Sequence, residues 1–457
     1  MIKGLEFDQA RHDFRRRVYW DHLAEASFLF EQRCGLFRRS DIAWRSMAAT
    51  EKRLEANLDA LMVGGDLALE VCRQQAVEGD PSELQAAVCV FCRQDRMDLV
   101  VEALKAFDPR DAERIKAVSD ALNHETIEKS LGQAIQIIQR GNSTESSLLA
   151  RGLGYRRLSD GMALLQVWEK NRSVLSQNLV WALGRLRPPA ARLLLLDQGL
   201  ESKDEAIRVA SAMSLLRLGE FQAVNRCLQL ARSETWPLLP LGLGGGLSAV
   251  RVLLEVAATT PSPDSLTALG LLGDVSAVEV LLSHLLKPDL SLTAAQSLNL
   301  ITGAEIGESV FISEPVDEDE LFSEEIKKQN EGATERSEAQ QPKGNTIIRL
   351  SQKIEDWRKW WSDNKTRFNP KIRYRHGEQY SPACLLEYLE SPKSPYAIRQ
   401  LAYEELVIRY HVDFPFEADM FVSEQNEALS KYRAWINANA QRFQEGKWYF
   451  AGQAMPF

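Results

Sequence analysis

Apolar and polar residues alternate with a helical period along most of the chain. The segment DEAIRVASAMSLLRLG (204–219) shows the pattern, because its apolar residues fall on one side of a helix. Asp204 can cap the start of this helix, and Gly219 can end it. A second helical segment follows that glycine. The pattern therefore predicts helical hairpins that follow one another along the chain.

One part of the hairpin recurs in the sequence. LSAVRVLLEVA (247–257) and VSAVEVLLSHL (275–285) are identical at six of eleven positions, and a weaker copy, FQAVNRCLQLA, begins at residue 221. Six glycines follow the same spacing: Gly154, Gly184, Gly219, Gly245, Gly273 and Gly303. Their steps average about 30 residues, which is typical of helical repeats. Because a single hairpin cannot bury its apolar face, we predict an all-α fold in which hairpins stack as an α-solenoid.

The glycine-rich stretch LGLGGGLSAV (241–250) raises the alternative of a phosphate-binding loop. The third glycine position of a dinucleotide-binding motif is occupied here by Leu247. Pro237 and Pro240, just upstream, do not suit a central parallel strand. No Lys-Ser or Lys-Thr pair follows, which excludes a Walker loop. The stretch therefore predicts a turn between two repeat helices, with small residues such as Ala268 allowing the helices to approach closely.

The sequences before and after the repeats do not follow the repeat pattern. We predict four parts: a helical N-terminal cap (1–60), a repeat array (61–305), an acidic polar linker (306–346) and a tryptophan-rich helical C-terminal module (347–457). In the last part, Trp357, Trp360 and Trp361 share one helix face. This face could bind a partner, but burial against the last repeat is the more common use of such an apolar area.

The linker carries a dense acidic run. Seven acidic residues lie within twelve positions: Glu314, Asp317, Glu318, Asp319, Glu320, Glu324 and Glu325. Such runs are usually solvated linkers. The alternative is an acidic arm that mimics nucleic acid and occupies a basic partner. These seven residues are the partner-binding candidates that the sequence offers.

Composition narrows the classes of partner. The chain has 457 residues, 45% of them hydrophobic, and a formal net charge of −9. This charge does not favour nucleic acid as the main partner. It suits a basic protein, because opposite fields speed the encounter of two proteins. No apolar run is long enough to span a membrane, and the first twenty residues lack the apolar core of a signal peptide. We therefore expect a cytoplasmic protein with no membrane partner.

Residues with catalytic or metal-binding chemistry are scattered. Cys89 and Cys92 stand in CVFC, but a second ligand pair is missing, and a reduced, helix-buried pair is expected. The six histidines show no paired-ligand spacing, and His284 on an apolar repeat helix is expected to be a packed or a face residue. No nucleophile motif is present. We expect a protein that is not an enzyme, without catalytic, cofactor-binding or metal-binding residues, although residues distant in sequence could still converge in space.

The sequence also resembles a known family. The repeats look like short bacterial HEAT repeats, and HLAEASFLFEQR (22–33) with EKRLEANLDALMVGGD (51–66) is similar to the opening of a family of uncharacterised bacterial HEAT-repeat proteins. WRKWWSDN, RYRHGEQYSPACLLEYL, PFEADMFVSEQ and GKWYFAGQ resemble its ending. The resemblance covers nearly the whole chain and carries no catalytic residues. It implies an association with type VI secretion gene clusters and their toxic effectors.

Charge and resemblance together predict an immunity protein that binds and neutralises a cognate type VI secretion toxin, such as a basic nuclease. An adaptor that loads an effector onto the secretion spike is the first alternative. A nucleic-acid-binding helical repeat would need a basic concave face. A lyase that attaches pigments to proteins would need a pocket and a coloured cofactor. We expect the concave surface of the solenoid to be the binding surface.

Overall fold

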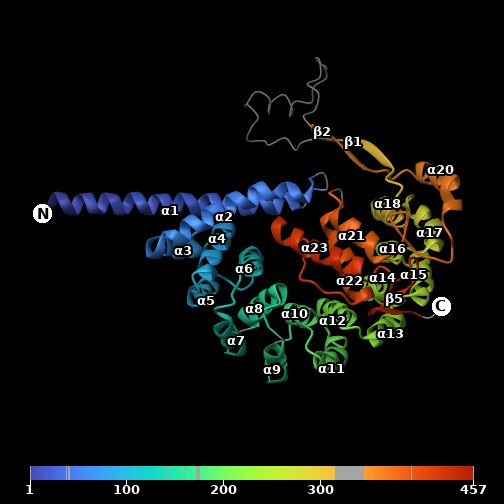
Figure 1. The fold of residues 1–457 in the computed structure, drawn as a ribbon, viewed down its shortest axis with the longest axis horizontal. Helices are drawn as coiled ribbons and strands as arrows, with labels where there is room; N and C mark the ends of the chain where they lie inside the picture. The colour runs from blue at the N-terminus through green and yellow to red at the C-terminus, as the bar shows by residue number, and fades with distance from the viewer. Residues whose placement is uncertain are drawn as a thin grey trace, which may run out of the picture.

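The repeat array is two rows of helices that follow an arc (Figure 1). The computed structural model describes residues 2–37, 39, 42–140, 143–159, 161–170, 175–313, 344–392 and 394–455. Each inner helix packs against the next inner helix along the arc, and each outer helix packs against its inner neighbours. The predicted all-α solenoid is confirmed.

The inner row comprises α4 (Pro81–Arg93), α6 (Ala112–His124), α8 (Ser143–Arg156), α10 (Gln177–Leu186), α12 (Glu205–Arg217), α14 (Leu238–Gly244), α16 (Pro263–Leu272) and α18 (Pro288–Thr302). The outer row comprises α3 (Gly65–Glu78), α5 (Met97–Lys105), α7 (Leu131–Arg140), α9 (Met162–Lys170), α11 (Ala191–Leu194) with η3 (Leu195–Gly199), α13 (Phe221–Leu230), α15 (Leu247–Thr259) and η4 (Val275–Ala277) with α17 (Val278–His284). The three similar sequence copies are thus successive outer helices.

Local sequence sets the helix ends. Asp80 and Glu83 form a capping box at the start of α4, with Pro81 in the first turn, as the Asp-Pro pair indicates. A second Asp-Pro pair, Asp108-Pro109, does not start a helix in this way, because α6 begins at Ala112 and is capped by Asp111. Gly273 ends α16 in the left-handed conformation, with φ of +70°. Glycine adopts this conformation without the steric cost that other residues meet.

Two of the six periodic glycines have another role. Gly154 and Gly184 lie inside α8 and α10, where each faces a small residue of the next inner helix, Ala182 and Ser214. Their side-chain hydrogen lets the two backbones approach closely. The expected turn at the glycine-rich stretch is present, because α14 ends at Gly244 and α15 begins at Leu247.

Gly242 allows a test of this close packing. We expect Gly242→Ala to lower the free energy of unfolding by about 1–3 kcal/mol, because its Cβ would lie 2.6 Å from the Cα of Ala268 on α16. Gly132→Ala in α7 is the matched control, since no atom lies within 4 Å of its Cβ. There alanine should raise stability by about 0.4–1 kcal/mol. Urea unfolding of both variants measures the difference, and equal effects would refute the packing role.

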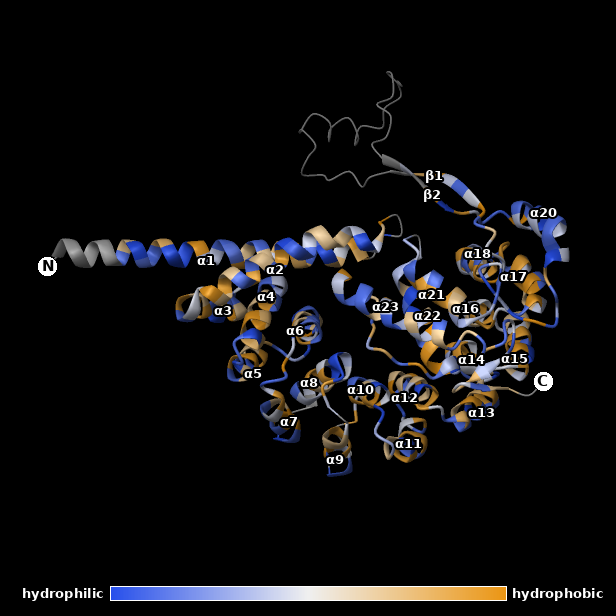
Figure 2. Ribbon diagram, in the orientation of Figure 1, coloured by the Kyte–Doolittle hydropathy of each residue, from blue (hydrophilic) through white to orange (hydrophobic). Residues whose placement is uncertain are grey.

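The N-terminal segment forms α1 (Ile2–Phe37), η1 (Trp44–Met47) and α2 (Ala48–Val63). The second half of α1 packs on α2, α3 and α4, whereas its first half extends beyond the array (Figure 1). Hydrophobic residues concentrate between neighbouring helices of the array, and hydrophilic residues are frequent along the free part of α1 (Figure 2). In the described part of the chain, no helix combines the length and apolar character needed to cross a bilayer.

After α18, the two ends of the predicted linker pair with each other as strands. β1 (Gly307–Ser313) and β2 (Gly344–Leu350) pair antiparallel, with Gly307 opposite Leu350 and Ser313 opposite Gly344. This hairpin differs from the expectation of a linker without regular structure. Exposure alternates along β1, with Glu308 and Val310 half-buried and Ser309 and Phe311 exposed, which is the two-residue period of a strand.

The C-terminal module consists of α20 (Ile354–Asn364), η6 (Lys365–Arg367), β3 (Tyr374–Arg375), β4 (Glu378–Gln379), α21 (Pro382–Glu390), α22 (Tyr396–Tyr410), α23 (Val422–Ala438), β5 (Tyr449–Phe450) and β6 (Gln453–Ala454). Helix α20 packs against α17, and Trp357 is buried, so this face serves the core as the more common use suggested. The sequence predicts a last helix that ends in QEGKWYFAG, but α23 ends at Ala438, and Tyr449–Phe450 pair with Gln453–Ala454 as the β5–β6 hairpin.

Candidate protein-binding site

The concave side of the array is not free along its whole length. Helix α22 packs on α12 and α14, and β3 packs on α18. The module therefore lies inside the arc and covers the inner row from α10 to α18 (Figure 1). The expectation of an open concave surface is wrong for this part, because the chain's own C-terminal module occupies it.

The first contact between array and module is a buried ionic cluster. Arg185 on α10 binds Glu417 (Nε–Oε1, 2.6 Å) and Glu404 (Nη2–Oε1, 2.9 Å). Arg217 on α12 binds Glu404 (Nη1–Oε2, 2.6 Å) and Asp413 (Nη2–Oδ2, 2.8 Å). Each cation comes from the array and each carboxylate from the module. Buried charges are tolerated because each has an opposite partner.

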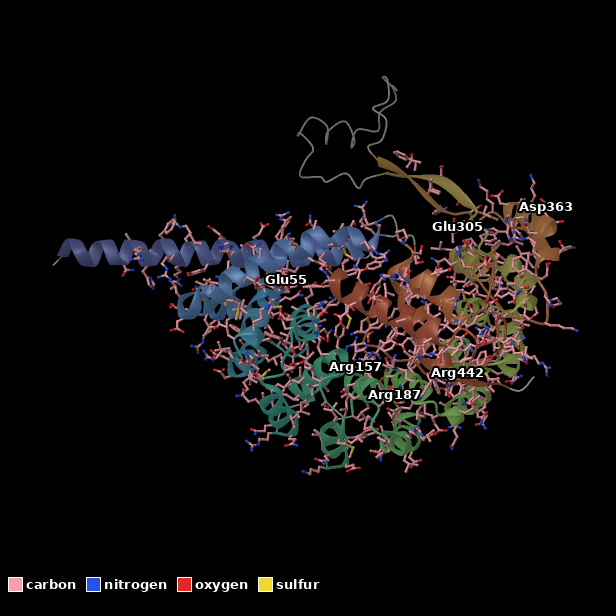
Figure 3. The ribbon with its side chains drawn as sticks, in the orientation of Figure 1. Glu55, Arg157, Arg187, Glu305, Asp363 and Arg442 are labelled. Atoms are coloured by element: carbon pink, nitrogen blue, oxygen red, sulfur yellow. The ribbon has the colours of Figure 1, made fainter. Side chains whose placement is uncertain are left out.

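Arg157 completes this cluster between the inner row and the module (Figure 3). Its Nη2 donates to the hydroxyl of Tyr403 at 2.8 Å and lies 3.6 Å from Asp413 Oδ1. Burial alone would raise the pKa of Asp413, but Arg217 and Arg157 outweigh burial and hold it at about 2. The carboxylate therefore stays ionised inside the interface.

The second contact caps the ends of inner helices. Arg373 donates to the carbonyls of Leu272 and Leu271 at the end of α16, at 2.8 and 3.0 Å. Arg409 donates to the carbonyls of Gly242 and Gly245 at the end of α14, at 3.0 and 3.2 Å. Cations are stabilised by the negative end of a helix dipole.

These bonds show what the glycine-rich stretch contacts. It ends α14 and offers its carbonyl oxygens to a guanidinium group of the module. In the phosphate-loop alternative, backbone N–H groups would face an anion. The contacts of this stretch instead connect the array to its own C-terminal module.

An open cleft remains at the other end of the concave side. It has a volume of about 580 Å³ and lies between the second half of α1, the start of α4, the inner face of α6 and the module. Its principal lining residues are Phe30, Glu31, Arg33, Cys34, Phe37, Asp80, Glu113, Lys116, Asp120, His124, Tyr396 and Asp419. A volume in the range of 300–1,000 Å³ is typical of ligand sites.

Arg33 fixes the wall of the cleft that α1 contributes. Its Nε binds Glu51 Oε1 at 2.8 Å, and its Nη2 donates to the carbonyls of Asp419 and Met420 at 2.6 and 3.1 Å. The guanidinium carbon lies 4.4 Å from the ring centre of Phe37. Since Arg33 is buried and its charge is paired with Glu51, it holds α1 to the module and leaves little positive charge toward the cleft.

Negative charge dominates the remaining lining. Lys116 pairs with Asp120 on the same face of α6. Glu31 and Glu113 are exposed and, within the part of the chain that the structure describes, have no hydrogen-bond or ion-pair partner. A cleft lined by unpaired carboxylates attracts a cationic ligand.

The floor of the cleft holds two perturbed groups. Burial, and to a smaller extent Glu417, raises the pKa of Asp419, whose Oδ1 accepts a bond from the Tyr155 hydroxyl at 2.9 Å. Burial also lowers the pKa of His124, so this ring is neutral at pH 7. His124 stacks on Phe421 with ring centres 5.2 Å apart, and its Nδ1 is buried without a hydrogen-bond partner among the described residues.

The seven acidic residues that the sequence singled out are Glu314, Asp317, Glu318, Asp319, Glu320, Glu324 and Glu325. They lie outside the described residues, between β1 and β2 in the chain. The cleft residues were not singled out. One signal was available: Glu113, Lys116, Asp120 and His124 share a helix face by their spacing.

The cysteine pair and the repeat-helix histidine considered for catalysis or metal binding are packed inside the helical array. Cys89 and Cys92 are buried in α4 as free thiols. His284 is buried, and its Nε2 lies 2.8 Å from the Ala257 carbonyl. Among the described residues, no group of three or more His, Cys, Asp or Glu is arranged to hold a metal ion. Comparisons of the chain with protein-family models, curated proteins and solved structures gave no match.

Proposed function

We propose that this chain is a non-catalytic α-solenoid that binds a basic protein through the cleft. The main support for this proposal is the position of the cleft. There α1, α4, α6 and the module bring carboxylates together on the uncovered part of the concave side. More specifically, we propose an immunity protein that neutralises a cognate type VI secretion toxin. The net charge of −9 and the resemblance of the chain ends to HEAT-repeat proteins near such toxins support this choice.

Two alternatives differ in what they require. An effector-loading adaptor would also bind its cargo but would leave the cargo toxic. A nucleic-acid-binding repeat needs a basic concave face. In the described part of the chain, the module covers much of the concave side, and the lining of the open cleft carries more carboxylates than cations. The structure therefore favours a protein partner over nucleic acid.

Reversing two charges at the rim of the cleft tests the proposal. A toxin encoded beside this chain is expressed in bacteria with the wild-type chain or with Glu31→Lys/Glu113→Lys. We expect wild type to restore growth and the variant to fail. The affinity of the purified pair should fall at least about tenfold, which corresponds to 1.4 kcal/mol. Titration calorimetry measures that affinity.

Glu70→Lys/Glu279→Lys is the matched control. Glu31 and Glu70 are exposed within helices α1 and α3, and Glu113 and Glu279 are exposed in the first turns of α6 and α17. The control should retain protection and affinity. Binding without protection by wild type would support the adaptor, whereas equal losses in both variants would refute the cleft as the binding site.

A further inference from the structure

We infer that the cleft receives an arginine side chain of the partner, with Tyr396 as its aromatic platform and the carboxylates of α6 as its counter-charges. This inference rests on the proposed function, because it takes the cleft as the partner-binding site. It adds the chemical group that is recognised.

The aromatic part of the cleft comes from two distant segments. Tyr396 is the first residue of α22, and its side chain lines the cleft beside Phe37 of α1. The ring centres are 5.8 Å apart at an angle of 57°. Tyr396 remains 39% exposed. A large ring left open within a cleft offers a face on which a flat cation can stack.

The opposite side supplies the charge. Glu113 and Asp120 lie seven residues apart, on the face of α6 that lines the cleft. Lys116 lies between them on this face and pairs with Asp120, so Glu113 keeps an uncompensated carboxylate. Glu31 adds a second free carboxylate from α1. A cation on Tyr396 would therefore meet carboxylates of two helices.

The chemistry favours arginine over lysine. A guanidinium group is planar, is weakly hydrated and donates in a fork, so it can stack on a ring and bind a carboxylate at the same time. The chain repeats this arrangement at the edge of the same cleft. Arg33 lies between the rings of Phe37 and Phe421, at 4.4 and 4.8 Å from their centres, while it binds Glu51.

Fluorescence anisotropy with the full chain and short labelled peptides tests the inference. The probes alternate glycine with three arginines, three lysines or three citrullines, at 0.15 M salt. We expect the arginine peptide to bind at least about fivefold more tightly than the lysine peptide, and the citrulline peptide not to bind. Tyr396→Ala should weaken arginine-peptide binding about three- to thirty-fold. Tyr396→Phe should retain most of it.

Two further variants keep the test decisive. Phe14→Ala removes an exposed ring of α1 outside the cleft and should change nothing. Asp120→Asn should weaken the arginine peptide without removing a ring. Circular dichroism checks that each variant is folded. Equal affinity for arginine and lysine peptides, or no difference between Tyr396→Ala and Phe14→Ala, would overturn the inference.

Failure of the arginine site can be distinguished from failure of the proposed function. If the rim reversal abolishes toxin binding but the peptides show no dependence on Tyr396, the arginine site is refuted and the protein-binding cleft stands. If the arginine preference depends on Tyr396 but the toxin is neither bound nor neutralised, the immunity role is refuted and the arginine site stands.

Discussion

Glu405→Gln is expected to lower the free energy of unfolding by about 3–5 kcal/mol, because it leaves buried guanidinium groups without a counter-charge. Glu405 is fully buried on α22. It binds Arg375 and lies 3.9 Å from both Arg373 and Arg409. Glutamine keeps the shape of the side chain and removes only its charge.

The surroundings of Glu405 make this loss large. All three arginines are at most 1% exposed. Burial and the neighbouring Arg409 already lower the pKa of Arg373 to about 10. Nη1 of Arg373 and Nε of Arg409 have no hydrogen-bond partner within the described chain. The carboxylate also accepts a bond from the Tyr380 hydroxyl at 2.6 Å. Water cannot replace the lost charge at this depth.

A surface pair provides the control for Glu405→Gln. Glu255 binds Arg232 at 2.7 Å, but both side chains are about half exposed. Glu255→Gln should change stability by less than about 1 kcal/mol. Urea unfolding followed by tryptophan fluorescence compares the two variants, and limited proteolysis reports whether the module is released. A loss below about 1 kcal/mol for Glu405→Gln would show that the buried charge is compensated in another way.

The helical rows could be predicted because their signals are local. Apolar spacing, the Asp204 cap and glycine helix ends act within one or two turns of a helix. The same signals gave the turn at 241–250. They did not distinguish the packing glycines, such as Gly184, from the capping glycines, such as Gly273. Which role a glycine has depends on whether a neighbouring helix approaches it, and the tertiary fold decides this.

The occupied concave face could not be predicted in this way. Arg185 and Arg217 occupy polar positions of amphipathic helices, and a polar position is ordinarily interpreted as solvent-exposed. Their partners Glu404 and Asp413 lie about 200 residues further along the chain. A buried ion pair and two exposed charges have the same local pattern. A signal did exist, because an arginine recurs near the end of successive inner helices α8, α10 and α12.

The cleft could not be predicted from local sequence patterns either. Its lining comes from α1, α4, α6 and the module, so no continuous motif exists. The acidic run of 314–325 is conspicuous because its residues are adjacent in sequence. In contrast, Glu31 and Glu113 are inconspicuous until the fold brings them to one rim. Net charge suggested the sign of the partner, but the fold was needed to suggest where it binds.

Gly273→Ala is expected to lower the free energy of unfolding by about 2–5 kcal/mol, through two costs that act together. Gly273 has a φ of +70°, a conformation that an L side chain disfavours. Its added Cβ would also collide with the carbonyl oxygen of Tyr374 on β3. Moving β3 away would break the bond from the Tyr374 amide to the Gly273 carbonyl, which is 2.8 Å long.

Gly65→Ala separates these two costs. Gly65 has a φ of +58° at the start of α3, and no atom lies within 4 Å of its Cβ. It should therefore lose only the conformational part, about 1–2 kcal/mol. Urea unfolding gives both values, and hydrogen exchange at β3 locates the damage. If the module docks as described, Gly273→Ala should increase exchange at Tyr374 and Arg375, while Gly65→Ala should leave it unchanged. Equal losses without a change at β3 would mean that the module does not depend on this contact.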